Sequence, residues 1–436
     1  QYMATLNVGD KGCIIYVKGS TEAILERCDQ AQDTQGNFTN LSHGEIEQIA
    51  ESFAEKGLRV LAFAQKSGNS DTLERQDIES GLTFLGLQGM IDPPRQEAIQ
   101  AVDACQKAGI QVKMVTGDHQ VTASAIATMM HLNQQDHAPA LTGRDLSDRD
   151  DEALKNAVED TAVFARVAPE QKLRLIEALQ AKGHVVAMTG DGVNDAPALK
   201  QADIGIAMGE MGTEVAKEAS DIILTDDNFA SIEAAVEEGR TVYLNLKKAI
   251  AFVLPVNGGE LLTILASVML GTALPILPLQ ILWVNMVSSS SLSIPLAFEP
   301  KPDGVMQKPP RPPNQPLLTE DILWRIGIIS LFNWAVTFGM FEWMQGRTEE
   351  TALARTMAVQ TLVAAEVFYL LCISRFISSL WNKLRGKAET LAYAPVVGIA
   401  VLVILQILFS QLGIFNNLFN TVPLGWTQWL MCLGTG

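Results

Sequence analysis

The spacing of hydrophobic and polar residues changes character near residue 248. Up to that point, short apolar runs bounded by turn residues alternate with amphipathic stretches, which predicts strands alternating with helices. Beyond it, apolar blocks are separated by short polar linkers, and each block is close to the roughly 20 residues that cross a bilayer as a helix. We therefore expect a soluble part followed by a membrane part.

The soluble part shows two patterns. Residues 1–75 mix strands and helices, whereas residues 83–246 alternate strand and helix, which is typical of a parallel, doubly wound sheet. The predicted strands are 1–7, 13–18, 59–65, 83–89, 111–116, 162–165, 185–189, 204–208 and 221–224. The predicted helices are 21–28, 43–56, 96–108, 121–130, 169–182 and 229–247.

The apolar blocks of the membrane part have the length of spanning helices. Five lie at 249–270, 276–298, 322–343, 351–373 and 393–411, and a sixth runs from 422 to 436, too short to cross. The linkers 299–319 and 374–390 are richer in Lys and Arg than the linkers on the opposite side. Because basic loops stay cytosolic, we expect these two linkers and the soluble part in the cytosol.

Composition narrows the function classes. The formal net charge of −17 argues against a nucleic-acid partner, which would select a basic face. The five cysteines have neither paired nor zinc-like spacing, so a disulfide framework is not expected. No signal peptide precedes the soluble part, in agreement with a cytosolic location for it.

Three oxygen-bearing side chains follow the predicted strand 185–189. Glycines on both sides of Asp191 allow a sharp turn that exposes this residue at the carboxyl end of the strand, where open parallel sheets carry their chemistry. Asn194 and Asp195 come within one further turn. Two carboxylates so close repel each other unless a cation lies nearby, and a cluster of hard oxygen ligands suits Mg²⁺. The alternative is a solvated, Asp-rich turn.

The string Thr-Gly-Asp-Gly-Val-Asn-Asp-Ala-Pro-Ala-Leu at 189–199 resembles the Mg²⁺-binding hinge signature of P-type cation-transporting ATPases. The resemblance implies that Asp191 and Asp195 bind Mg²⁺ and that Asn194 takes part in catalysis.

Two further motifs suit phosphoryl chemistry. In Thr116-Gly117-Asp118, at the end of a predicted strand, the hydroxyl and the glycine amide could bind a phosphoryl oxygen, aided by the following helix. Lys172, in the first turn of a predicted helix, could neutralise a transferring phosphoryl group. Singly, each is explained by a structural turn or a snorkelling lysine. Together they resemble the haloacid-dehalogenase-like, Rossmann-like phosphoryl-transfer core.

A looser resemblance concerns the nucleotide. Lys18-Gly19-Ser20-Thr21-Glu22 resembles the Lys-Gly-Ala-Pro-Glu motif of the family's nucleotide-binding domain. It implies that Lys18 lies near ATP and that Arg59 is a second cationic contact, which are expected residue types for a polyphosphate. The alternative is two ordinary surface bases.

The family's phosphorylated aspartate lies in Asp-Lys-Thr-Gly-Thr, and this string does not occur in the 436 residues. The resemblance therefore suggests a carboxyl-terminal piece of a longer pump, whose amino-terminal part is the missing partner. We expect no phosphoenzyme from these residues alone.

Polar residues inside the apolar blocks are informative because each is costly at bilayer depth. Asn257 and Glu260 lie three apart beside Pro255 and two glycines in the first block. The second block carries Asn285, Ser288 and Ser289 on one helical face, and the fourth carries Glu366. The serines are equally explained as hydrogen-bonding links between helices. The two glutamates indicate a shared cation or protonation.

These six positions resemble the cation ligands of type II calcium pumps, with one departure. Ser289 stands where those pumps have an aspartate shared by two ion sites. The loss of that carboxylate weakens the case for two Ca²⁺ per cycle. It leaves one Ca²⁺, or a monovalent cation (Na⁺, K⁺ or H⁺) with proton exchange.

The resemblance implies a partial α+β nucleotide-binding domain at 1–82, then an α/β haloacid-dehalogenase-like phosphorylation domain at 83–246 that lacks its first strand. An α-helical transmembrane bundle at 247–436 would correspond to the family's fifth to tenth helices. The expected function is ATP-driven cation transport, with Ca²⁺ export favoured, across a bacterial plasma membrane. A membrane-anchored phosphatase and a non-catalytic binding subunit are the alternatives.

Overall fold

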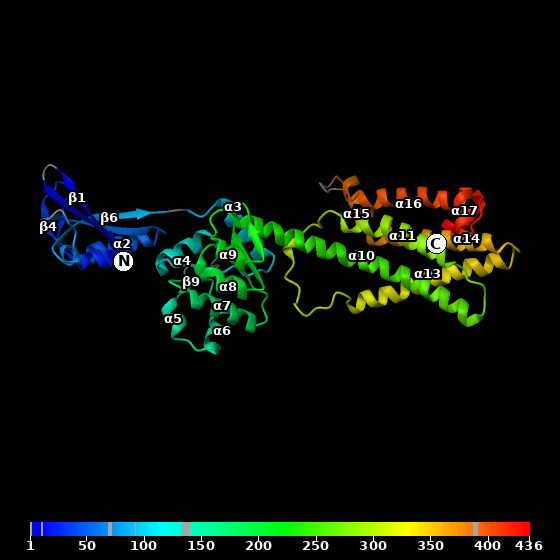
Figure 1. Ribbon diagram of the computed structural model, residues 1–436, viewed down its shortest axis with the longest axis horizontal. Coiled ribbons are helices and arrows are strands. Elements are labelled where there is room, and N and C mark those ends of the chain that lie inside the picture. The colour runs from blue at the N-terminus through cyan, green and yellow to red at the C-terminus, as the bar shows by residue number, and fades with distance from the viewer. Residues whose placement is uncertain (1, 10–11, 69–71, 92, 133–139, 387–390) are drawn as a thin grey trace. The chain divides into compact units, whose positions relative to one another are not determined.

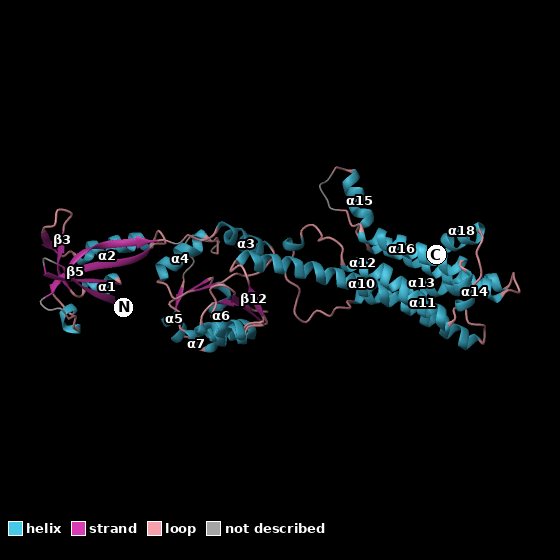
Figure 2. Ribbon diagram, turned by 45° about the horizontal axis from the view of Figure 1, so that its top comes forward, coloured by secondary structure: helices cyan, strands magenta, loops and turns pink. Residues whose placement is uncertain are grey.

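The computed structural model describes residues 2–9, 12–68, 72–91, 93–132, 140–386 and 391–436. The chain divides into two compact units (Figure 1). The first comprises residues 1–234 and 306–313, and the second comprises residues 235–305 and 314–436. The first unit contains every described strand, and the second is helical (Figure 2).

The first unit begins with a six-stranded mixed sheet in the order β1-β2-β5-β6-β3-β4. Its strands are β1 (Tyr2–Gly9), β2 (Gly12–Gly19), β3 (Cys28–Gln32), β4 (Phe38–Asn40), β5 (Arg59–Gly68) and β6 (Leu82–Met90). Side chains alternate along β2, with Ile15 and Val17 buried and Ile14 and Tyr16 exposed. The buried face packs against α1 (Thr21–Leu25) and α2 (His43–Ala54), which leaves the opposite face open.

Strand β6 belongs to the six-stranded sheet and to neither sheet of the α/β region. The alternating pattern assigned this strand to the α/β region, but β6 pairs antiparallel with β5 and parallel with β3. Its first residues, Leu82 and Phe84, are buried in the core of the six-stranded sheet. The first sheet therefore extends to Met90.

The α/β region forms two three-stranded parallel sheets rather than the single sheet expected, because no pairing joins β7 to β10 among the described residues. One sheet has the order β7-β9-β8, with β7 (Met114–Val115), β8 (Leu141–Thr142) and β9 (Val163–Ala165). The other has the order β10-β11-β12, with β10 (Ala187–Gly190), β11 (Ile204–Met208) and β12 (Ile222–Leu224).

Helices alternate with these strands. The helices α3 (Gln96–Lys107), α4 (Gln120–Met129) and α7 (Pro169–Ala181) lie where the sequence pattern predicted them, whereas α5 (Gly143–Ser147), α6 (Asp151–Asp160), α8 (Ala196–Gln201) and α9 (Glu214–Ala219) were not predicted. Helix α7 begins with Pro169, whose fixed φ and missing N–H suit the first helical turn. Its inner face, including Leu175 and Ala178, joins the core formed with Phe164 of β9.

The second unit is a helical bundle. Its α-helices are α10 (Phe229–Leu270), α11 (Pro278–Ser288), α12 (Ile294–Ala297), α13 (Glu320–Gln345), α14 (Thr351–Ile373), α15 (Phe376–Leu384), α16 (Ala394–Gln411), α17 (Gly413–Phe419) and α18 (Trp426–Thr435). Within the described ranges, α10, α13, α14 and α16 are long and apolar enough to cross a membrane. The helix predicted at 229–247 and the span predicted at 249–270 are one continuous helix, α10.

The span predicted at 276–298 consists of three helical segments instead of one. A π-helical segment, Ser289–Ser293, separates α11 from α12. Pro295 has no N–H, so it cannot complete the α-helical hydrogen bond to the carbonyl of Ser291. That carbonyl lies against Gly398 of α16, where a Cβ atom would have no room. The close approach of α16 and the proline together account for the widened turn.

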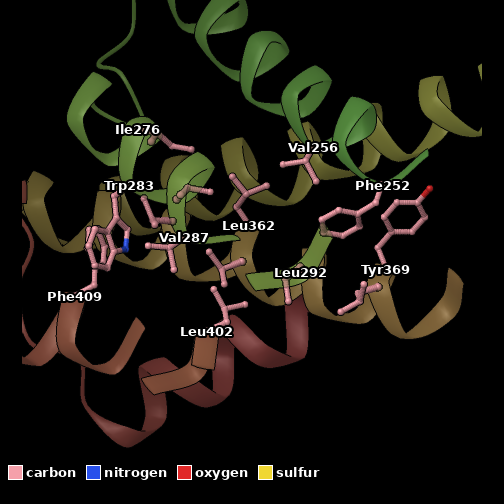
Figure 3. Packing of buried hydrophobic residues seen from close by; sticks show 14 of the residues in the cluster. Phe252, Val256, Ile276, Trp283, Val287, Leu292, Leu362, Tyr369, Leu402 and Phe409 are labelled. Atoms are coloured by element: carbon pink, nitrogen blue, oxygen red, sulfur yellow. The ribbon is translucent and has the colours of Figure 1, made fainter. Parts of the chain in front are cut away.

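Stacked aromatic rings occupy both ends of the bundle's largest apolar cluster (Figure 3). Trp283 of α11 stacks on Phe409 of α16 with ring centroids 5.5 Å apart, and Phe252 of α10 stacks on Tyr369 of α14 at 5.9 Å. The Tyr369 hydroxyl also donates to the carbonyl of Ala251 at 2.8 Å. This is the carbonyl that Pro255 leaves without its helical N–H, so α14 repairs the break in α10.

Candidate functional sites

The carboxyl end of β10 is organised around a buried carboxylate. Asp195 is 6% exposed. Its Oδ1 accepts from Lys172 Nζ at 2.6 Å, and its Oδ2 accepts from the backbone N–H groups of Asp191 and Gly192 at 3.3 and 3.2 Å. A Cβ atom on Gly190 would lie 2.6 Å from the Cβ of Asp195, so only glycine fits beside it. Both oxygens of Asp195 are thus used to hold Lys172 and the turn.

The other two polar residues of this motif are exposed. The side chains of Asp191 and Asn194 lie at the surface, while the Asp191 backbone carbonyl accepts from the N–H of Thr213 at 2.8 Å. Mg²⁺ is commonly bound by one or two carboxylates together with substrate phosphates and water. Asp191, which is exposed, fits such a ligand, and Asp195 additionally holds Lys172 and the loop through its three hydrogen bonds.

The motif Thr116-Gly117-Asp118 forms a tight turn after β7. The Thr116 hydroxyl accepts from the N–H of Asp118 and donates to its carboxylate, both at 3.1 Å. The turn is tied to the segment after β9, because Val167 N–H donates to the Thr116 carbonyl and Arg166 N–H to the Asp118 carbonyl. Gly117 is exposed, with open space around its α-carbon.

A continuous set of contacts therefore joins the three soluble motifs. The Thr116 turn is bonded to Val167, and α7 begins two residues later at Pro169. The first turn of α7 carries Lys172, which reaches Asp195 at the end of β10. The carboxyl ends of β7 and β10 thus carry a hydroxyl and an exposed carboxylate, and α7 supplies an ammonium group. Groups of these types suit phosphoryl chemistry.

Lys18 and Arg59 share the open face of the six-stranded sheet. Lys18 in β2 lies opposite Phe63 in β5, and Arg59 is four residues from Phe63 along the same strand. An even separation keeps side chains on one face, and four residues span roughly 13 Å. Both side chains are exposed. Two cations at this separation fit opposite ends of an extended anion such as a nucleoside triphosphate.

Three helices of the bundle bring polar side chains together within its apolar interior. Glu260 of α10 is 5% exposed and accepts from Asn285 Nδ2 of α11 at 2.8 Å. Glu366 of α14 is fully buried, close enough to Glu260 to interact electrostatically and adjacent to Ser288 of α11. Four of the six residues expected at a cation site therefore converge.

This cluster has unmet polar groups. Within the described part of the chain, Glu260 Oε1, both Glu366 carboxyl oxygens and Ser288 Oγ complete no hydrogen bond. No group of three or more His, Cys, Asp or Glu side chains among those residues is arranged to hold a metal. Two carboxyls, one amide and one hydroxyl are nevertheless hard oxygen donors suited to an alkali or alkaline-earth cation.

The other two residues expected at the cation site, Asn257 and Ser289, do not lie in this cluster in the same way as the first four. Asn257 is exposed on the outer side of α10, and it does not join Glu260. Ser289 is partly buried and begins the π-helical segment, one residue after Ser288.

Buried polar residues on α13 were not expected. Ser330, Asn333 and Thr337 are almost completely buried, and Ser330 Oγ donates to the carbonyl of Pro255 at 3.2 Å. Asn333 lies against Gly259, where an added Cβ atom would meet its Cβ at 2.5 Å. Their spacing of three and four residues within an apolar block was the available signal.

Comparisons with known families match three regions of the chain. Residues 1–97 match the P-type ATPase cytoplasmic domain N, residues 172–236 match the haloacid dehalogenase-like hydrolases, and residues 273–436 match the cation transporting ATPase C-terminus. These regions contain Lys18 and Arg59, the Lys172–Asp195 pair, and Glu366, respectively.

Curated relatives align along nearly the whole chain. "Cation-transporting ATPase pma1" of Synechocystis sp. is 59% identical over 99% of this chain and 48% of its own length. "Probable cation-transporting ATPase F" of Mycobacterium bovis is 45% identical over 99% of this chain and 48% of its own length. The "Calcium-transporting ATPase" of Bacillus subtilis is 37% identical over 98% and 48%. The chain spans about half the length of these relatives, and it belongs to the P-type cation-transporting ATPases.

Proposed function

We propose that this chain is part of a pump that couples formation and hydrolysis of an aspartyl phosphate to cation transport, with Ca²⁺ as the transported ion. The observation that carries the proposal is the convergence of two buried carboxyl groups, Glu260 and Glu366, from two different helices of an apolar bundle. Uncompensated carboxyls at such depth are costly, and a divalent cation between them would offset both charges.

In this proposal the six-stranded sheet binds ATP, the α/β region carries out phosphoryl transfer, and the helices correspond to the fifth to tenth of the family. Lys18 and Arg59 would bind the nucleotide. Because β6 completes the first sheet, the nucleotide-binding part would extend to Met90 instead of residue 82.

The phosphoryl-transfer roles follow from what each group can donate. The Thr116 hydroxyl and Gly117 N–H would bind phosphoryl oxygens, and Asn194 would orient the phosphoryl group by hydrogen bonding. Lys172 would neutralise developing charge, held in position by its 2.6 Å bond to Asp195. Mg²⁺ would supply further charge neutralisation at Asp191, with Asp195 fixing the loop that carries this ligand.

The phosphorylated aspartate is proposed to belong to a part of the polypeptide outside these 436 residues. The soluble unit would face the cytosol at the plasma membrane of a bacterium, as the basic linkers favour. Incubating these 436 residues with γ-labelled ATP should leave no acid-stable phosphate on them. Stable labelling would contradict this part of the proposal.

For the cation, Asn285 and Ser288 would complete the oxygen ligands around Glu260 and Glu366. Asn257 and Ser289 would join them through movement of α10 and of the π-helical segment. A monovalent cation is the second candidate, because Ser289 supplies a neutral hydroxyl where the calcium pumps have a carboxylate.

The test is ion-stimulated ATP hydrolysis by the complete protein in proteoliposomes, measured with Ca²⁺, Mn²⁺, Na⁺ and K⁺. We expect Ca²⁺ to stimulate hydrolysis, and Glu260→Gln and Glu366→Gln to abolish the stimulation. Glu342→Gln is the matched control, since this carboxylate is exposed on α13 and should leave the stimulation unchanged. Stimulation by Na⁺ or K⁺ instead would select the monovalent candidate, and full Ca²⁺ stimulation in both site variants would exclude the proposed cation site.

A further inference from the structure

A short helix, α15, lies between two helices that are long and apolar enough to cross a membrane. It begins at Phe376, three residues after α14 ends at Ile373, and its last residue, Leu384, is ten residues before the first residue of α16. Figure 2 shows α15 beside one end of α16. The short connections to α14 and α16 keep α15 near the membrane boundary. This placement does not depend on which ion the protein transports.

The apolar side chains of α15 point away from the bundle. The exposed fractions are 54% for Ile377, 38% for Leu380, 56% for Trp381 and 73% for Leu384. With Phe376, and at about 100° per residue, these positions fall within one arc of about 140°. A helix that borders only water would instead expose its polar side.

The polar side of α15 is anchored to the protein through one buried residue, while its neighbour Ser378 stays exposed. Ser379 is 1% exposed, its hydroxyl donates to the Phe376 carbonyl at 3.0 Å, and it accepts from the N–H of Ala392 at 3.4 Å. The N–H of Arg375, just before the helix, donates to the carboxylate of Glu299 at 2.8 Å. The helix is therefore held in a defined orientation with its apolar face outward.

Two basic residues flank that apolar face. On the same helical projection, Lys383 lies beyond one edge of the arc and Arg385 beyond the other. The Arg385 guanidinium lies over the Trp381 ring, 4.9 Å from its centroid. Long basic side chains beside an apolar face, with a tryptophan among them, are typical of helices that lie in the headgroup region of anionic bilayers.

We propose that α15 is an interfacial helix whose exposed face binds the surface of an anionic bilayer. Its four exposed apolar side chains enter the headgroup–acyl boundary, and Lys383 and Arg385 bind lipid phosphates. An anionic bilayer supplies both an apolar layer and negative charge beside the ends of α14 and α16. A second copy of the chain would instead need an apolar surface bordered by acidic residues at this place.

The test uses the complete protein in nanodiscs of phosphatidylcholine, with or without phosphatidylglycerol. An environment-sensitive fluorophore is attached at Leu380→Cys, or at Ser378→Cys on the polar side of the same helix. Cys13→Ser and Cys372→Ser remove the more accessible thiols. We expect the probe at position 380 to be immersed in phosphatidylglycerol nanodiscs and the probe at 378 to stay in water.

Removing the two basic charges tests the proposal quantitatively. Each basic side chain near an anionic surface contributes a factor of roughly five to surface binding, so Lys383→Gln with Arg385→Gln should lower the immersed-to-free ratio roughly thirtyfold. Quenching of Trp381 by brominated phosphatidylglycerol, taken as the difference from Trp381→Phe, gives a second readout without a label. Equal exposure of the probes at 380 and 378 would overturn the proposal. Equal immersion with and without phosphatidylglycerol would assign the face to neutral lipid or protein, and would also overturn it.

Discussion

Replacing Gly190 by alanine should loosen the turn that follows β10. The added Cβ atom would lie 2.6 Å from the Cβ of Asp195, whereas ordinary contact begins at 3.4 Å. Asp195 must therefore move by about 0.8 Å, because its Cβ atom is attached directly to the backbone and side-chain rotation cannot move it away. That shift carries its Oδ2 out of reach of the backbone N–H groups of Asp191 and Gly192, which now lie at 3.3 and 3.2 Å.

The cost combines overpacking, about 1–3 kcal/mol, with weakened hydrogen bonds to a buried carboxylate, about 1–3 kcal/mol. These terms overlap, so we expect about 2–4 kcal/mol of local stability to be lost. Hydrogen exchange followed by mass spectrometry measures this directly. Amides in the segment 187–200 should exchange roughly thirty- to several-hundred-fold faster.

The matched control is Gly192→Ala in the same loop. Its Cβ atom would meet Asp195 Oδ2 at 3.6 Å, an ordinary contact, and its φ of −101° suits any residue. This variant should exchange nearly as slowly as the natural protein. If Gly190→Ala exchanges no faster than Gly192→Ala, then Asp195 does not organise the turn.

Three further variants test the helical bundle by thermal unfolding in nanodiscs. Tyr369→Phe leaves the Ala251 carbonyl without a hydrogen-bond donor and should lower the free energy of unfolding by about 1–3 kcal/mol. Its control, Tyr393→Phe, changes an exposed ring and should cause no measurable loss. Glu299→Gln removes the charge that holds a lysine at 2.6 Å and should cost about 3 kcal/mol, partly recovered when that lysine is also neutralised. Gly259→Ala should destabilise through contact with α13, while Gly239→Ala on the same helix, with open space around it, should stabilise slightly.

Elements with a strong local pattern were predictable from the sequence. The alternation in β2 and the proline that opens α7 both specify structure from neighbouring residues alone. The motifs at the ends of β7 and β10 were predictable for the same reason, since glycine and polar residues follow short apolar runs.

Elements whose structure depends on partners far away in the chain were not predictable from the sequence. The helix predicted at 21–28 ends at Leu25, because β3 starts at Cys28. That strand is largely polar, without a clear alternation, and its pairing partner β6 lies about fifty residues away in the chain. The same distant pairing moved β6 into the first sheet.

The membrane cluster shows the limit of helical spacing. Asn257 and Glu260 are three residues apart, about 60° on the helix surface, yet one is exposed and the other buried. The edge of the buried surface falls between them, and only contacts with α11 and α13 decide where that edge lies. Likewise, the three hydrogen bonds that Asp195 accepts could not be foreseen from its chemical type, and its role as a Mg²⁺ ligand stays a prediction.

The π-helical segment Ser289–Ser293 changes the direction in which the side chains after it point. A single extra residue in one turn rotates everything after it by about 100° relative to a regular α-helix. Pro295 and Leu296 therefore point in a different direction from the one they would have in a regular α-helix continued from Asn285 and Ser288. In this position Leu296 is fully buried. Deleting one serine of this run would restore a regular α-helical repeat and rotate residues 294–297 by about 100° relative to Asn285 and Ser288.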